Sequence, residues 1–388
     1  MDVRERIRRR QRRDRSRLIR DYDALSPVGH LAEPTDRGPV LEELLDHLDP
    51  MFDGRLPPNA YVHGPAGAGK SAVVTALFRE LRAALTDRSG IHTATRARPA
   101  AAPSFVYVDT RRDDSAFAFY RAVLDELVDE SIPEHGVKTE TLRGRLQSVA
   151  GGSRGGVVLA VDHAGEPDSV EAGTLVDLLT GLPGNVRWLA VGRGEPAATE
   201  LTRHTGGTVQ VRPYRRHALL DVLRTRAADG LAPDSLGHDR TRRIAEWADG
   251  DAHDALAALL IAAELAADAG RDRIGDADVE TAVEEIPDPC VSLGRVLALP
   301  ANKQAVLRRL VDVDESRRAS VSEATAAIGS ARSVDLSAGT IKRFLYELAE
   351  SGIVELIERT AGRDQGRPPS RVEPRFPPTA FRRLYDRR

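Results

Sequence analysis

The chain alternates runs of consecutive apolar residues with stretches in which apolar residues recur at helical spacing. Five apolar runs predict buried strands, at 60–63, 104–109, 157–162, 186–192 and 207–211. An uninterrupted apolar run bounded by turn residues is typical of a strand covered on both faces of a parallel sheet. Helical spacing in the same half of the chain predicts helices at 38–48, 72–81, 116–129 and 139–150. This alternation predicts an α/β doubly wound sheet.

The second half of the chain has a different pattern, which is almost entirely helical. An Ala-rich segment predicts a helical lid with helices at 218–229, 239–248, 252–269 and 276–285. The Pro-Asp-Pro sequence at 287–289 then predicts a break after the last of these helices. Further helices at 303–313, 320–328 and 337–351 precede a strand at 353–359 and a loop at 362–370. Three helices followed by a β-hairpin predict a winged helix, whose third helix belongs in the DNA major groove.

These changes of pattern predict four parts. We expect a basic arm at 1–20, a nucleotide-binding domain at 21–214, the lid at 215–290 and a winged-helix domain at 291–388. A chain of 388 residues is long enough for two or three domains with their own cores.

The segment Gly64–Ser71 fits the P-loop pattern G-x-x-x-x-G-K-[ST], and it lies between a predicted strand and a predicted helix, as that pattern requires. Glycines let backbone N–H groups turn inward around phosphate oxygens at the positive end of the helix. We therefore expect Lys70 to contact the outer phosphates and the Ser71 hydroxyl to bind magnesium. The alternative is a Gly-rich turn that binds nothing.

Asp162 ends the predicted strand at 157–162. A carboxylate at the carboxyl end of such a strand is placed to contact the magnesium of a P-loop site. Ser71 and Asp162 are therefore the predicted metal-binding residues, and ATP with Mg²⁺ are the predicted cofactors. The alternative is that Asp162 is a turn residue.

The net charge of −3 conceals a strong charge asymmetry along the chain. Residues 1–20 carry a balance of +7 and residues 358–388 a balance of +5, so the segment between them is acidic. Basic ends on an acidic body indicate contact with a polyanion, although an Arg-rich tail can also be simply solvated. Only four of the basic residues are lysines, a bias that fits either a salt-rich cytoplasm or a GC-rich genome. One cysteine, Cys290, excludes an internal disulfide, and no apolar run approaches the roughly 20 residues of a membrane span.

The predicted winged helix supplies the candidate DNA-binding residues. On the third helix these are Thr340, Lys342 and Arg343, and on the wing they are Arg359, Arg363, Arg367 and Arg371. Double-stranded DNA is therefore the expected partner, and no membrane is. A winged helix used only for protein contacts is the alternative, because a fold does not fix a function.

In this order, these parts resemble the archaeal AAA+ initiators of the origin-recognition and cell-division-cycle type, over about residues 20–388. The lead-in from Tyr22 through Arg37-Gly38-Pro39-Val40 is similar, as is the segment that begins at Val211-Arg212-Pro213-Tyr214. The resemblance implies a P-loop AAA+ parallel sheet with a helical lid, and it implies nucleotide contacts from Tyr214 and Arg226. The full predicted nucleotide-binding set is Gly64, Gly67, Ala68, Gly69, Lys70, Ser71, Ala72, Tyr214 and Arg226.

Three positions depart from the pattern of that family. His163 stands where the family has a glutamate after the strand aspartate, Arg193 lies in the sensor-asparagine segment, and His253 replaces the lid arginine. These positions act on the terminal phosphate or on the attacking water, so no catalytic residue is assigned and ATP hydrolysis is expected to be weak.

The sequence leaves two functions open. The first is an ATP-binding and DNA-binding replication initiator, located in the cytoplasm on the nucleoid, with a replicative helicase as a candidate partner. The second is an ATP-gated winged-helix regulator of transcription or of a mobile element. An active ATPase motor is disfavoured by His163, Arg193 and His253.

Overall fold

The computed structural model describes residues 18–89, 102–330, 335–358 and 370–388. The chain forms two compact units. The P-loop unit is His30–Tyr214, and the lid–wing unit contains the chain before His30 together with Arg215–Arg388. The predicted four-part division remains a prediction, and most of the predicted basic arm lies outside the described residues.

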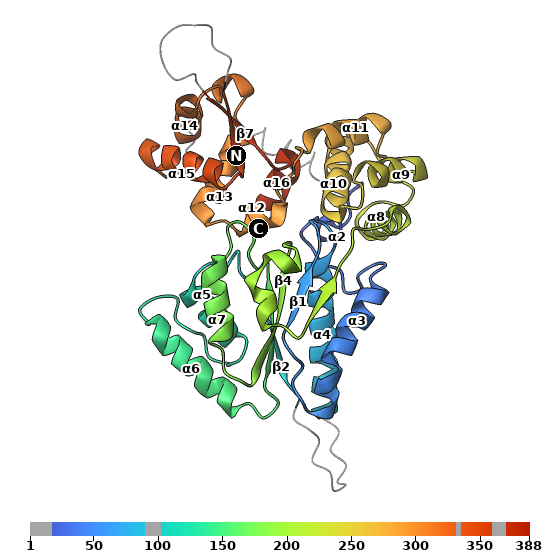
Figure 1. The fold of residues 1–388 in the computed structure, drawn as a ribbon. Coiled ribbons are helices and arrows are strands. Elements are labelled where there is room, and N and C mark those ends of the chain that lie inside the picture. The colour runs from blue at the N-terminus through green and yellow to red at the C-terminus, as the bar shows by residue number, and fades with distance from the viewer. Residues whose placement is uncertain (1–17, 90–101, 331–334, 359–369) are drawn as a thin grey trace. The chain divides into compact units, whose positions relative to one another are not determined.

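A five-stranded parallel sheet forms the centre of the P-loop unit (Figure 1). Its strands are β1 (Ala60–His63), β2 (Ser104–Asp109), β3 (Val157–Asp162), β4 (Val186–Gly192) and β5 (Gly207–Gln210). Their order is β2-β3-β4-β1-β5, and each neighbouring pair runs parallel. All five therefore end at the same edge, where the P-loop begins.

Helices cover both faces of this sheet (Figure 1). One face packs against α3 (Gly38–Leu48) and α4 (Lys70–Ser89), and the other against α5 (Ala116–Asp125), α6 (Thr139–Gly152) and α7 (Ala172–Thr180). Along β3, Leu159 and Val161 enter one core while Val158 and Ala160 enter the other, which is why the strand is apolar at every position. Short 3₁₀ turns at Asp49–Asp53, Pro196–Ala198 and Glu200–His204 complete the unit. The α/β prediction is confirmed, and α7 was not predicted.

The lid half of the lid–wing unit is helical. Its helices are α2 (Tyr22–Leu25), α8 (Arg216–Gly230), α9 (His238–Trp247), α10 (Ala252–Asp268) and α11 (Asp276–Glu285). Helix α10 is buried along most of its length, from Ala255 to Ala267, because other helices of the unit pack around it. Its Ala-rich sequence allows that close packing.

The remaining elements form the winged helix. They are α12 (Leu293–Ala298), α13 (Ala301–Leu310), a 3₁₀ turn at Glu315–Arg317, α14 (Val321–Gly329), α15 (Ala338–Glu350), β6 (Val354–Glu358), β7 (Ser370–Pro374) and α16 (Pro378–Tyr385). Strands β6 and β7 form the antiparallel hairpin. The predicted winged helix is confirmed, whereas α12 and α16 were not predicted. No helix among the described residues is long and apolar enough to cross a membrane.

Candidate nucleotide site and DNA-binding helix

The P-loop has the backbone geometry of a phosphate cradle. It links β1 to α4, and two of its glycines hold conformations that other residues rarely adopt. Gly64 has φ +154° and Gly69 has φ +76°. A Cβ atom at Gly64 would lie 2.0 Å from the Val211 carbonyl oxygen, and one at Gly69 would lie 2.7 Å from the Tyr214 hydroxyl oxygen. At Gly64 a side chain would clash with fixed backbone, and at Gly69 the left-handed backbone favours glycine, so the loop holds the tight turn that the P-loop pattern requires.

Lys70 lies in the first turn of α4 and is buried. Its Nζ donates to the carbonyl oxygens of Gly64 at 2.8 Å and of Pro65 at 2.7 Å. The ammonium group is thus held inside the loop. Ser71 and Ala72 follow in the same turn and are half-buried.

Arg37 is a part of this site that the sequence did not single out as a site residue. Its side chain is buried, and its Nη2 donates to the Ala68 carbonyl oxygen at 2.9 Å and to that of Arg212 at 3.2 Å. Its guanidinium carbon lies 3.5 Å from the centroid of the Tyr214 ring, a cation–π contact. Arg37 therefore joins the segment before the sheet, the P-loop and Tyr214.

Asp162 is almost fully buried at the end of β3. The Tyr107 hydroxyl donates to its Oδ2 at 2.6 Å, and the His163 backbone N–H donates to its Oδ1 at 2.8 Å. Burial, together with the charge of Asp162, raises the pKa of Tyr107 well above its usual value, so the phenol keeps its proton. Both carboxylate oxygens are thus aligned by donors, and Tyr107 is a second residue that the sequence did not indicate.

His163 and Arg193 lie in one charged cluster around a second carboxylate, Glu166. His163 has a left-handed backbone, with φ +63°, and its Nδ1 lies 3.5 Å from Glu166 Oε1. Arg193 Nε lies 3.1 Å from Glu166 Oε2, and Arg111 Nη2 pairs with the same oxygen. Burial opposes the charged form of Glu166, but its contacts with His163, Arg111 and Arg193 outweigh burial and hold its pKa below the usual value. Two of the three altered positions are therefore built into one ionic network.

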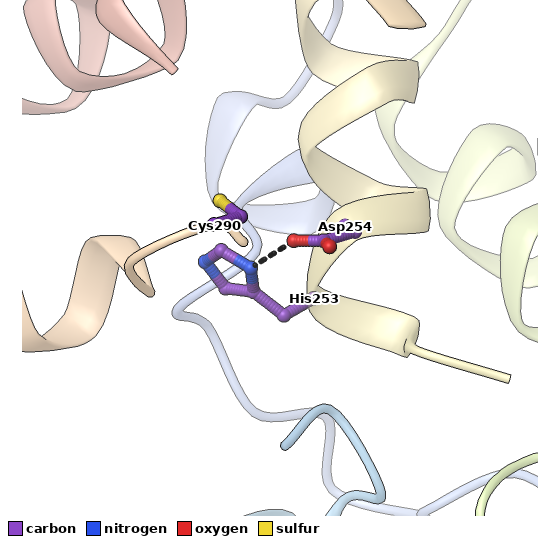
Figure 2. Close-up of side chains that lie close together, drawn as sticks. All are labelled: His253, Asp254 and Cys290. Atoms are coloured by element: carbon purple, nitrogen blue, oxygen red, sulfur yellow. Dashed lines mark hydrogen bonds and ion pairs between the residues drawn. The ribbon is translucent and has the colours of Figure 1, made fainter. Parts of the chain in front are cut away.

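The third altered position, His253, lies in the lid–wing unit beside Asp254 and Cys290 (Figure 2). The atoms of these three residues that could bind a metal lie within 4.8 Å of one another. However, the Leu293 backbone N–H donates to His253 Nε2 at 2.9 Å. A backbone N–H can only donate, so Nε2 carries no proton, and Nδ1–H faces Asp254 at 3.0 Å.

A metal ion at this cluster would need an unprotonated Nδ1 and a thiolate. The first condition would break the bond to Leu293, and burial raises the pKa of Cys290 well above its usual value. The cluster is therefore a structural contact between α10 and α12, and His253 has no nitrogen left for a phosphate.

Arg226 is buried on α8 within the lid–wing unit. It donates to the carbonyl oxygens of Ala24, at 3.0 Å, and of Gly29. The side chain thus holds the lead-in segment against α8, and its predicted contact with nucleotide stays a prediction.

Some of the predicted DNA-binding residues already contact other side chains of the protein, and others do not. On α15, the Thr340 hydroxyl lies 2.9 Å from that of the capping residue Ser337, and Arg343 pairs with Glu347 at 3.6 Å. Lys342 is exposed, and among the residues that the structure describes no ion pair engages it. Arg371 on β7 lies 2.7 Å from Glu373 and 3.5 Å from Glu315. The other predicted wing residues, Arg359, Arg363 and Arg367, lie outside the described residues.

The C-terminal arginines are less available to DNA than their number suggests. Arg375 pairs with Glu355, Arg382 lies 3.8 Å from Asp312, and Arg383 pairs with the buried Glu264. Their charges are matched inside the lid–wing unit, so α15 presents the clearer candidate surface.

Comparison with known proteins identifies two domains in this chain. A family model described as an AAA ATPase domain matches residues 33–189, and one described as a Cdc6 AAA+ ATPase-type lid domain matches residues 220–284. ORC1-type DNA replication protein 10 of Halobacterium salinarum is 25% identical over 375 residues, which cover 89% of this chain and 86% of the relative.

Solved structures show the same fold. The Aeropyrum pernix ORC1 protein, solved in complex with DNA, has a TM-score of 0.59 at 22% identity and covers 95% of this chain and 97% of its own. The A. pernix ORC2 protein, solved in ADPNP–ADP complexes, has a TM-score of 0.55 at 16% identity and covers 95% and 98%. The two matched domains, together with relatives that align over nearly the full length, show that this chain carries an AAA ATPase domain and a Cdc6-type AAA+ lid and is similar, at about 25% identity, to archaeal ORC1-type DNA replication proteins.

Proposed function

We propose that this protein binds ATP and duplex DNA, initiates replication at origins, and hydrolyses ATP slowly. The observation that carries the proposal is an intact P-loop in one chain with a winged helix whose helix α15 exposes Lys342. Relatives named as DNA replication proteins, and a fold shared with an ORC1 protein solved in complex with DNA, support it.

The nucleotide would be held by the backbone of the P-loop, by Lys70 and by Tyr214, whose hydroxyl already lies over Gly69. Ser71 and Asp162 would hold magnesium, which supplies positive charge to the phosphates when bound. Lys70 would leave the carbonyl oxygens of Gly64 and Pro65 and pair with phosphate, because an ammonium gains more from an anion than from neutral carbonyls.

Slow hydrolysis follows from the geometry at His163. The family's general base is a glutamate, and here the imidazole takes its place on a left-handed backbone, beside the carboxylates of Asp162 and Glu166. Burial lowers the pKa of His163, but the two carboxylates raise it by more than burial lowers it. The net result is a pKa above the usual value for histidine. The carboxylates therefore favour the protonated imidazole, which is the form that cannot accept a proton from water.

The rate of phosphate release tests this part. Loss of a general base removes roughly 10²–10⁴-fold of rate, and a typical kcat is about 10 per second, so we expect no more than a few turnovers per minute. Faster turnover that Lys70→Ala abolishes would contradict the proposal.

Binding to DNA would proceed through α15 in the major groove, as in other winged helices. A fluorescence-anisotropy titration of duplex DNA should show weaker binding by Lys342→Glu than by the parent. Lys138→Glu is the matched control, since Lys138 lies at the N-cap of α6 in the P-loop unit. Equal losses in the two variants would contradict a role for α15.

An ATP-gated regulator of transcription or of a mobile element is the second candidate, supported by the changes at His163 and His253. Chromatin immunoprecipitation distinguishes the two candidates, because an initiator occupies replication origins and a regulator occupies promoters. A replicative helicase as partner and a location on the nucleoid remain part of the first proposal.

A further inference from the structure

The carboxylate of Glu166 binds two guanidinium groups, one from the end of β2 and one from the end of β4. Arg111 follows β2, Arg193 follows β4, and Glu166 follows β3, the strand between them. Both arginines contact the same carboxylate oxygen, Oε2. Since only 4% of the Glu166 side chain is exposed, this carboxylate is desolvated and depends on its partners.

The two arginine side chains differ in how easily each can move away from Glu166. The Arg111 side chain is only 3% exposed, so it cannot exchange Glu166 for water without opening the fold. The Arg193 side chain is 39% exposed. Two cations share one carboxylate, so Glu166 stays paired with Arg111 when Arg193 departs. Arg193 is therefore the member of the network that can move.

Strand register places Arg193 next to the phosphate loop. Gly192, the last residue of β4, pairs with His63, and Gly64 of the P-loop follows His63 directly. The Tyr61 hydroxyl donates to the Gly194 carbonyl oxygen at 2.9 Å and fixes the backbone just beyond Arg193. Only the long side chain of Arg193 then needs to move for its charge to shift from Glu166 toward the P-loop.

We propose that Glu166 is a positioning residue that holds Arg193 away from the nucleotide, and that the terminal phosphate of ATP draws Arg193 off Glu166. The proposal rests on the proposed binding of ATP by the P-loop. A phosphate group carries more negative charge than a carboxylate and accepts the guanidinium fork in two parallel bonds, so it competes well for Arg193. ADP lacks that group and leaves Arg193 on Glu166. The network thereby sets how strongly the protein distinguishes ATP from ADP.

Calorimetric titration of the full chain with ADP and with ADPNP, a slowly hydrolysed ATP analogue, tests this proposal. Arg193→Gln should weaken ADPNP binding roughly tenfold or more, the size of one charged hydrogen bond, and change ADP binding less than about twofold. Glu166→Gln should shift the affinity ratio toward ADPNP, and the double variant should match Arg193→Gln alone. Arg187→Gln is the matched control, because Arg187 lies near the opposite end of β4.

The outcomes separate the possible failures. Equal loss of both nucleotides in Arg193→Gln, or an unchanged ratio in folded Glu166→Gln, would overturn the proposal. If Glu166→Gln does not fold, Glu166→Asp replaces it, because the shorter carboxylate keeps the charge for Arg111 and weakens the hold on Arg193. A parent protein that binds neither nucleotide would overturn the proposed function itself, and this inference with it.

Discussion

Lys342 offers the sharpest test of how this protein would bind DNA. Its ammonium group is exposed on α15, and within the described ranges no carboxylate pairs with it. A cation that neutralises one phosphate releases condensed counterions, which contributes about 0.9 to the slope of log K against log salt concentration. We therefore expect Lys342→Ala to weaken DNA binding at low salt and to lower that slope by about 0.9.

This slope converts into a measurable difference. Over a fourfold rise in salt, from about 50 to 200 mM, the parent should lose about 3.5-fold more affinity than Lys342→Ala does. The assay is fluorescence anisotropy with one labelled duplex at four or more salt concentrations. Arg371→Ala is the matched control, because Glu373 and Glu315 already neutralise Arg371 and its loss should change the slope by less than half as much.

The reasoning is refuted if Lys342→Ala and the parent share one slope. It is also refuted if Arg371→Ala lowers the slope more than Lys342→Ala does, because the wing would then contribute more phosphate contacts than α15.

Other predictions concern the P-loop unit. Lys70→Ala should abolish ATP binding in calorimetry while circular dichroism shows the fold retained, because a P-loop lysine binds the phosphates of the nucleotide; equal ATP binding by the variant and the parent would contradict the assignment. Tyr107→Phe removes a charge-assisted hydrogen bond to Asp162 and should lower the free energy of unfolding by about 1.5–3 kcal/mol in urea titrations; an unchanged value would contradict that bond. Burial and the charge of Asp109 raise the pKa of Asp113 to about 6. The folded state then binds more protons than the unfolded state, so stability falls as pH rises from about 4 to 6, and Asp113→Asn should flatten that fall in melts across this range.

The sequence predicted the sheet well because a strand buried on both faces has a local pattern. The predicted ranges for β3 and β4 match the structure at both ends. Helix α16 was missed because arginines and Pro377-Pro378 made its segment resemble a basic tail. Proline at the start of a helix followed by buried Ala380 and Phe381 was the signal that could have found it.

Only part of the candidate site could likewise be predicted from the sequence. The P-loop depends on the conformation of eight adjacent residues, so its sequence alone indicated it. The contacts of Glu166 with Arg111 and Arg193 join ends of three strands, and a single sequence carries no pattern for such a contact. The contact between Arg37 and Tyr214 could not be predicted either, because the two residues are separated by most of the sequence of the P-loop unit.

The His253 contact determines which side chains position 253 can accept. Leu293 is fully buried, and its N–H relies on the imidazole as acceptor. An arginine, which the resemblance in sequence implies at position 253, offers only donors, so His253→Arg would leave that N–H unpaired, at a cost of about 1–3 kcal/mol. His253→Arg would therefore need a second, compensating change at the start of α12 to keep the stability of the lid. The hydrogen bond to Leu293 thus makes histidine at position 253 part of the packing between α10 and α12.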